Sequence, residues 1–126
     1  MPITFTHELD NTLLRIKAQG RDDSLEDARN YGMAVIALAR EHGSKAILCD
    51  ESELVYSLGT FDLFELAKAL AAAVPKVIKV ALIVHPSQIQ DAVFWETVGV
   101  NRSARVRVFK DTAGAEAWIQ STADPG

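Results

Sequence analysis

Cysteine is nearly absent from this sequence, since Cys49 is the only one among 126 residues. No internal disulfide can form, so a disulfide-stapled secreted scaffold is excluded. Positive charge is also scarce, with 13 Lys and Arg residues against 17 Asp and Glu residues and a formal net charge of -4. A mildly acidic chain has no general attraction for the phosphates of DNA or RNA, and we expect no nucleic-acid partner.

Long hydrophobic runs are missing as well. No apolar run approaches the roughly 20 residues that a membrane-spanning helix needs. The N-terminal stretch MPITFTHELD lacks the basic and apolar segments of a secretory signal, and we therefore expect a cytoplasmic protein. Hydrophobic residues still make up 48% of the chain, which is enough for the core of one domain. We expect this domain to span residues 1–120, with a flexible tail at residues 121–126.

The spacing of apolar residues predicts an α/β fold. Residues 3–6 and 13–18 alternate apolar and polar side chains around the turn pair Asp10-Asn11, which predicts an N-terminal β-hairpin. After the hairpin, strand-like segments alternate with helix-like segments, as in parallel sheets with right-handed crossovers. The predicted strands are 45–50, 77–84 and 105–109, and the predicted helices begin at caps Ser24, Thr60, Ser87 and Asp111. We expect a mixed five-stranded sheet with four helices.

Two segments near the C-terminus carry a recognisable pattern. The strand Arg105-Val106-Arg107-Val108-Phe109 is followed by Asp111, and the last helix contains Ala115-Glu116-Ala117-Trp118-Ile119. These resemble the "VRVF-D" strand and "A-x-W-L" terminal helix of the STAS/SpoIIAA-like family of bacterial proteins, which is related to the SEC14/CRAL-TRIO lipid-binding domains. The resemblance implies a SpoIIAA-like fold and a non-enzymatic regulatory module that acts through protein contact and needs no cofactor.

The turn before the second predicted helix departs from the pattern of classical members. Anti-sigma factor antagonists of the STAS group have an Asp-Ser-Ser/Thr-Gly turn here, whose second hydroxyl residue is phosphorylated. In this sequence Ser57 and Gly59 match, Leu58 replaces the phosphoacceptor and Tyr56 replaces the Asp. Ser57 and Thr60 are candidate regulatory phosphosites, because a helix N-terminus favours a phosphate. Their alternative role is to form the turn and cap the helix.

Polar side chains follow two of the predicted parallel strands. Asp50 and His85 lie at strand ends where ligands of open α/β sheets bind. A hydrolase site could be drawn from them with Ser57 or Ser87, but the Gly-x-Ser-x-Gly elbow of such enzymes is missing. Hydrolysis is therefore our third and weakest hypothesis, and we expect no enzyme.

The acidic cluster Asp50, Glu51 and Glu53 offers oxygen atoms to a metal ion, but it has no EF-hand spacing. We interpret it as a solvated loop and expect no metal site.

Cys49, inside a predicted strand, is interpreted as an inert buried thiol. A basic concentration in the second half favours either an acidic partner or anionic lipid headgroups, unless it is an ordinary exposed surface; it comprises Lys76, Lys79, Arg102, Arg105, Arg107 and Lys110.

The second and third predicted helices carry more apolar side chains than one buried stripe requires. Four aromatic residues stand out as ligand or interface candidates: Phe61, Phe64, Phe94 and Trp95. We expect core packing and a homodimer interface to cover this surplus. The alternative is a pocket for a small apolar ligand, or a face that contacts lipid or a membrane surface, as the SEC14 resemblance implies.

Overall fold

The computed structural model describes residues 2–121, and its strands form a mixed sheet in the order β1-β2-β3-β4-β5. The strands are β1 (Thr4–Asp10), β2 (Leu13–Arg21), β3 (Ala46–Val55), β4 (Lys79–Val84) and β5 (Arg105–Phe109). Strand β1 runs antiparallel to β2, and every other neighbouring pair is parallel. The hairpin turn uses Asn11 with φ of 56°, a conformation that Asn tolerates well. The predicted sheet and its N-terminal hairpin are confirmed.

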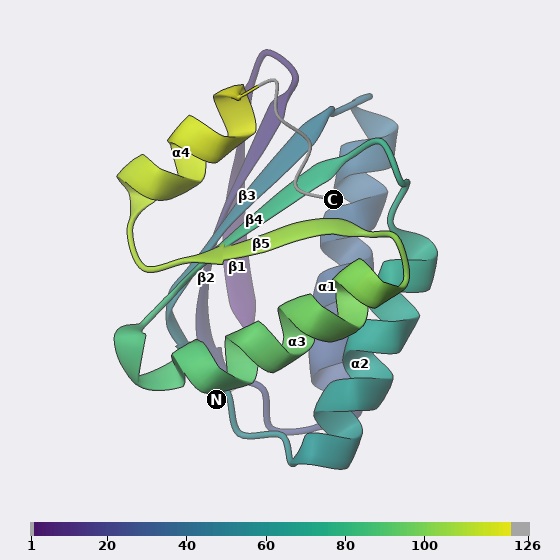
Figure 1. Ribbon diagram of the computed structural model, residues 1–126, viewed down its shortest axis with the longest axis vertical. Helices are drawn as coiled ribbons and strands as arrows, with labels where there is room; N and C mark the ends of the chain where they lie inside the picture. Colours follow the sequence, from purple (N-terminus) through teal and green to yellow (C-terminus); the bar gives the residue numbers. More distant parts are fainter. Residues whose placement is uncertain (1, 122–126) are drawn as a thin grey trace.

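Helices cover both faces of the sheet (Figure 1). The first face packs against α1 (Leu25–Glu41), α2 (Thr60–Ala73) and α3 (Ile89–Asn101), and α4 (Thr112–Gln120) packs on the other. Strand alternation explains this division, because successive side chains point to opposite faces. Ile47 and Leu82 belong to the larger cluster beneath the three helices, whereas Leu48 packs with Trp118 of α4. The four predicted helices are confirmed.

Two of the four predicted helix caps form as expected. The Ser24 hydroxyl accepts a hydrogen bond from the Asp27 N–H at 3.1 Å, and Asp111 accepts one from the Gly114 N–H at 2.7 Å. The predictions for Thr60 and Ser87 are wrong. Gly59 is the N-cap of α2, with Thr60 its first residue.

A short 3₁₀-helix, η1 (Pro86–Gln88), separates β4 from α3. Its N-cap is His85, whose ring accepts a hydrogen bond from the Ser87 N–H. Ser87 was expected to cap the third helix, but here its N–H is the donor to the cap residue. Pro86 explains the early start of this turn, because proline is preorganised for the first helical position.

Strand β3 continues well beyond the predicted segment, and the acidic cluster is part of it. Strand β2 is also longer than predicted, and its last residues pair with the end of β3 beyond an irregularity between Lys17 and Gln19. Alternation then places Glu51 on the face covered by α1–α3, where it is buried, while Asp50 lies on the opposite face. The interpretation of this cluster as a solvated loop is therefore wrong for Glu51, although Glu53 is exposed.

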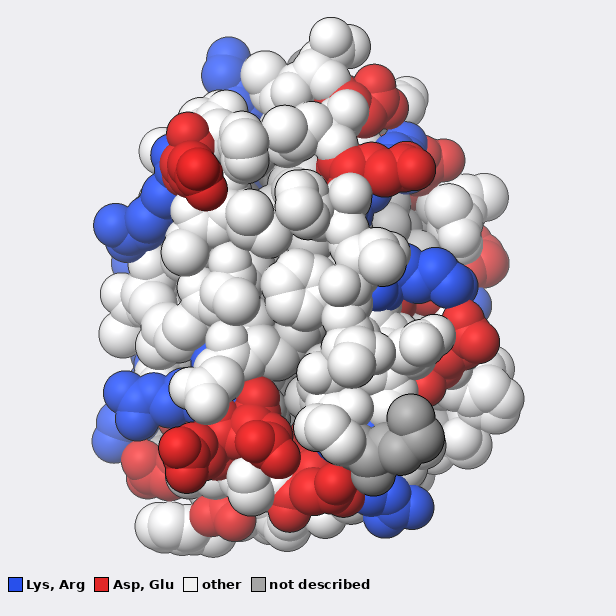
Figure 2. All heavy atoms as spheres, turned by 180° about the vertical axis from the view of Figure 1, so that it is seen from behind, with Lys and Arg blue, Asp and Glu red and all other residues white. Residues whose placement is uncertain are grey.

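The back of the molecule, opposite the view of Figure 1, carries its charges mainly around the margin. Uncharged residues occupy the centre of this face (Figure 2). A hollow between β1 and α1 is lined by Pro2, Ile3, Phe5, Asp27, Asn30, Tyr31 and Ala34.

Among the residues that the structure describes, none of the helices is long and apolar enough to cross a membrane. Of the tail expected at residues 121–126, residues 122–126 lie outside the described part of the chain.

Leu14 tests the main core directly, because its side chain is 0% exposed and contacts the cluster beneath α1–α3. We expect Leu14→Ala to lower the free energy of unfolding by about 2–5 kcal/mol, the usual cost of a buried leucine truncated to alanine. Its cross-strand neighbour Leu9 is 46% exposed, and we expect Leu9→Ala to cost no more than about 1 kcal/mol. Urea unfolding of both variants measures the difference, and equal losses would contradict the assigned core.

Candidate functional site

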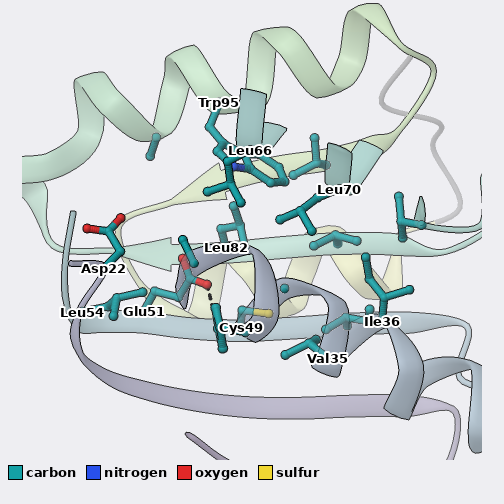
Figure 3. A pocket seen from close by; sticks show the side chains of 18 of the residues that line it. Asp22, Val35, Ile36, Cys49, Glu51, Leu54, Leu66, Leu70, Leu82 and Trp95 are labelled. Carbon is teal, nitrogen blue, oxygen red and sulfur yellow. Dashed lines mark hydrogen bonds between the residues drawn. The ribbon is translucent and has the colours of Figure 1, made fainter. Parts of the chain in front are cut away.

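A cavity of about 100 Å³ lies between the sheet and the three helices that cover its first face. Its walls are mainly apolar, with Val35 and Ile36 from α1, Leu66 and Leu70 from α2, Trp95 from α3 and Leu82 from β4 (Figure 3). Small side chains leave the space open, since Ala28, Ala71, Ala92 and Ala104 also line it. The cavity is therefore a consequence of small residues at positions where larger ones would fill the core.

Gly32 fixes how closely α1 approaches α2. A Cβ atom at this position would lie 2.6 Å from Leu70 Cδ1 and 2.7 Å from Leu70 Cδ2. The two helices therefore meet tightly at this point, although the cavity remains beside it. Gly32 lies on the buried face of α1.

One end of the cavity is polar, and its central group is the carboxyl of Glu51. This residue is 7% exposed. Oε2 accepts a hydrogen bond from the Tyr31 hydroxyl at 2.7 Å, and Oε1 accepts one from the Tyr56 hydroxyl at 2.5 Å. Burial raises the pKa of the Glu51 carboxyl above its ordinary value, although the two tyrosine hydrogen bonds lower it in part. The pKa of each tyrosine is well above its usual range, first through burial and then through the charge of Glu51.

A second carboxyl lines the same end of the cavity (Figure 3). Asp22 follows β2 and is buried, and its Oδ1 accepts hydrogen bonds from the Ser57 N–H at 2.5 Å and the Ser57 hydroxyl at 3.0 Å. Burial raises the pKa of Asp22, while the bonds from Ser57 oppose the shift. No Lys, Arg or His is among the described residues that line the cavity.

Gln88 holds this polar end in place. Its side-chain amide donates to the Leu54 carbonyl at 2.7 Å and accepts from the Tyr56 N–H at 2.7 Å. The segment after β3 is thereby tied to the start of α3, and the Tyr56 ring is held over Glu51. Sequence reasoning missed Gln88, Tyr31 and Asp22, because their contacts join segments that are far apart in the chain.

The four aromatic candidates lie in different environments. Phe61 is 74% exposed at the start of α2, and Phe94 is exposed on α3. Phe64 is half-buried, with the Arg102 guanidinium 5.3 Å from its ring centre. Trp95 is half-buried and lines the cavity. Of these four residues, Trp95 therefore lines the cavity, whereas Phe61 and Phe94 lie on the surface.

The two candidate phosphosites are both exposed but differ in their contacts. The Ser57 hydroxyl donates to the Asp22 carbonyl at 2.8 Å and lies beside the Asp22 carboxyl. A phosphate on Ser57 would meet this negative charge, which disfavours the modification. Thr60 is the first residue of α2, where a phosphate would meet free backbone N–H groups. Phosphorylation of either residue stays a prediction.

Asp50 and His85 do not form a common site. Asp50 accepts hydrogen bonds from Ser52 and Lys17 on the sheet face opposite the cavity. His85 is exposed and pairs with the Ser87 hydroxyl at 2.8 Å. Within the described chain no hydrogen bond joins the two residues, so the arrangement drawn for a hydrolase is not assembled.

The remaining predicted features have mainly structural surroundings. Cys49 is buried as expected, and burial followed by the charge of Glu51 raises the pKa of its thiol well above the usual range. Lys76 donates to the carbonyls of Ala71 and Arg102, and Lys79 donates to those of Trp118 and Ser121. These two lysines therefore bind backbone carbonyl groups of neighbouring segments.

Two solved structures share this architecture. An anti-sigma factor antagonist from Mycobacterium paratuberculosis superposes with a TM-score of 0.65 and 15% sequence identity, over 94% of this chain and 95% of that chain. An uncharacterised DUF3478-family protein with a SpoIIAA-like fold, from Shewanella loihica PV-4, superposes with a TM-score of 0.54 and 21% identity, over 94% of each chain. No protein-family model and no curated protein matches the sequence.

This chain has the SpoIIAA-like fold. The fold resemblance predicted from the C-terminal segments is confirmed by both superpositions. Neither structure is described as a SEC14 or CRAL-TRIO protein, so that relationship stays a prediction. At these identities the likeness concerns the fold alone, and the function has to be argued from the site.

The buried carboxyl predicts a specific pH dependence of stability. Folded Glu51 holds its proton more tightly than unfolded Glu51, so its contribution is fully present below the ordinary pKa of about 4.3. This contribution is lost as pH rises through the raised pKa of the folded state. Residue 51 does not titrate in Glu51→Gln, and the free energy of unfolding of the wild type relative to this variant should fall as the pH rises above the ordinary pKa of about 4.3.

Urea unfolding across this range measures the change. Each unit by which folding raises the pKa corresponds to about 1.4 kcal/mol. Glu53→Gln is the matched control, because Glu53 lies on the same strand but is exposed and has no burial cost. A difference between wild type and Glu51→Gln that stays constant with pH would contradict the raised pKa.

Proposed function

We propose that this protein is a non-enzymatic binding module whose cavity holds a small, mainly apolar molecule. The observation that carries the proposal is the cavity of about 100 Å³ between the sheet and α1–α3, apolar except at its Glu51 end. Such a combination of apolar walls and a few convergent polar groups is typical of small-molecule sites. Asp50 and His85 have different hydrogen-bond partners, which supports binding over hydrolysis.

The size of the cavity limits the ligand. A dry apolar cavity of about 150 Å³ binds benzene, so a cavity of about 100 Å³ suits a body slightly smaller than benzene. Apolar burial would provide most of the binding free energy, at about 0.8 kcal/mol for each buried methylene. The polar end would fix the orientation of the ligand.

Protein contact is the second candidate function, and the outer surface of α3 favours it. Val93, Phe94 and Val100 are exposed on this helix, and Phe61 is exposed on neighbouring α2. Exposed apolar side chains on one helix offer a candidate contact surface. The SpoIIAA-like fold, found in an anti-sigma factor antagonist, supports a regulatory role of this kind. We propose that a second copy of the chain binds this surface of α3, since symmetric dimers are the commonest soluble oligomers.

Filling the cavity should abolish ligand binding without unfolding the protein. In wild-type protein, millimolar isopentanol should shift the NMR amide signals of the cavity-lining residues Gly32 and Ala92. Ala71→Leu places a larger side chain in the cavity and should remove these shifts. Ala69→Leu is the control on the same helix, because Ala69 does not line the cavity.

Thermal unfolding verifies that both variants are folded before binding is compared. Native mass spectrometry of the freshly purified protein provides a second test, in which a small adduct should be present in wild type and lost in Ala71→Leu. Isopentanol shifts that persist in Ala71→Leu, or that are missing from wild type, would argue against the cavity as the binding site.

A charge on the outer surface of α3 should disrupt the proposed dimer. We expect the wild type to sediment as a dimer and Phe94→Glu as a monomer, because a carboxylate would be buried without a partner in the contact. Val77→Glu is the control, since Val77 is exposed in the segment before β4. A monomeric wild type would exclude the homodimer, and a dimeric Phe94→Glu would exclude this surface.

A further inference from the structure

The charges that line the cavity are all of one sign. Glu51 and Asp22 are both buried at the same end of it, and its other described lining residues carry no basic group (Figure 3). Ion pairs between described residues lie elsewhere: Arg15 pairs with Glu116 and Asp10, Lys17 with Asp50 and Glu53, and Lys68 with Glu65. The Glu51 carboxyl therefore has hydrogen-bond donors but no cation among the described lining residues, whereas the pKa of Asp22, which burial raises, is lowered in part by the charge of neighbouring Arg21.

Hydrogen bonds from neutral donors satisfy the Glu51 carboxyl only in part. Each oxygen accepts one bond from a tyrosine hydroxyl, whereas a carboxylate has about four acceptor positions. A buried carboxylate without a counter-ion is costly, and an opposite charge within a few ångströms relieves that cost. A group that both donates hydrogen bonds and carries positive charge would complement this end of the cavity.

We propose that the cavity takes a small primary alkylamine, with its ammonium group at Glu51 and Asp22 and its alkyl body among the apolar walls. This inference rests on the proposed function and specifies the class of ligand. An ammonium group has three donors and no acceptor, which matches the acceptor positions that the Glu51 carboxyl has left. The cavity volume limits the body to about four to six non-hydrogen atoms, judged from the fit of benzene to about 150 Å³.

The hollow between β1 and α1 adjoins this end of the cavity. Ile3 and Tyr31 line both the internal cavity and the hollow between β1 and α1. Tyr31 packs edge-on against Phe5, with ring centres 5.5 Å apart. A displacement of the Tyr31 ring would connect the hollow to Glu51, so the amine would enter with its charged end beside the carboxyl groups.

Three probes of nearly the same shape test the charge of the head group. Isopentylamine is a cation at neutral pH, isopentanol is neutral and isovalerate is an anion. We expect NMR titration of the wild type to show at least about tenfold tighter binding of the amine than of the alcohol, which corresponds to about 1.4 kcal/mol. Isovalerate should bind most weakly, because its charge repels both carboxyl groups.

Variants assign the preference to the cavity. Glu51→Gln should reduce the ratio of amine to alcohol affinity to near one while isopentanol still binds. Asp22→Asn should reduce the ratio in part, and it serves as the second variant if Glu51→Gln does not fold. Asp50→Asn is the matched control, because Asp50 is adjacent in sequence but lies on the opposite face of the sheet. This control should keep the full preference.

The outcomes separate this inference from the function on which it rests. Binding of the alcohol as tight as that of the amine would overturn the amine and leave the apolar-ligand function standing. An amine preference that survives in both Glu51→Gln and Asp22→Asn would also overturn it, because the attraction would then come from the acidic surface. Failure of all three probes to bind would overturn both proposals.

Discussion

The buried carboxyl of Glu51 determines the arrangement of one end of this molecule. Its two oxygens bind tyrosine hydroxyls from α1 and from the segment after β3, and thereby join a helix and a loop to the sheet. Gln88 then ties the same loop to the start of α3. The hydrogen bonds around Glu51 therefore fix α1, the segment after β3 and the start of α3 relative to one another. The burial of the Glu51 carboxyl is costly, and these hydrogen bonds offset that cost.

Sequence patterns were reliable wherever the local signal and the tertiary environment agreed. Strand β5 alternates apolar and charged residues and was predicted with its observed limits, and Ser24 and Asp111 cap helices as their local chemistry indicates. The predicted end of β3 was wrong, because polar residues predominate in the last part of this strand. Glu51 pairs with Val84 of β4, beside the irregularity in the pairing with β2. It faces inward because the alternation of Ile47 and Cys49 continues to it. A single sequence contains no signal for that long-range pairing.

The apolar surplus of α2 and α3 illustrates a second limit of sequence reasoning. Periodicity showed that these helices carry more apolar residues than one buried stripe requires, but it did not show which of them face inward. In the structure Trp95 lines a cavity and the adjacent Phe94 is exposed. Adjacent residues on a helix point about 100° apart, so a small rotation of α3 would exchange their roles. Packing of α3 against β5 and α2 settles that rotation.

Two energetic costs coincide at the cavity, and their coincidence is the strongest argument that the site has a use. Unfilled volume costs about 24 cal/mol for each Å³, so a cavity of about 100 Å³ forgoes roughly 2 kcal/mol of packing. The burial of Glu51 and Asp22 adds a second cost at the same place. Larger side chains at Ala71 or Ala92 would remove the first cost, and an apolar residue at position 51 would remove the Glu51 part of the second. Departures from good packing and from charge pairing are expected chiefly where a protein binds something. A ligand that fills the space and neutralises the carboxyl groups would offset both costs together.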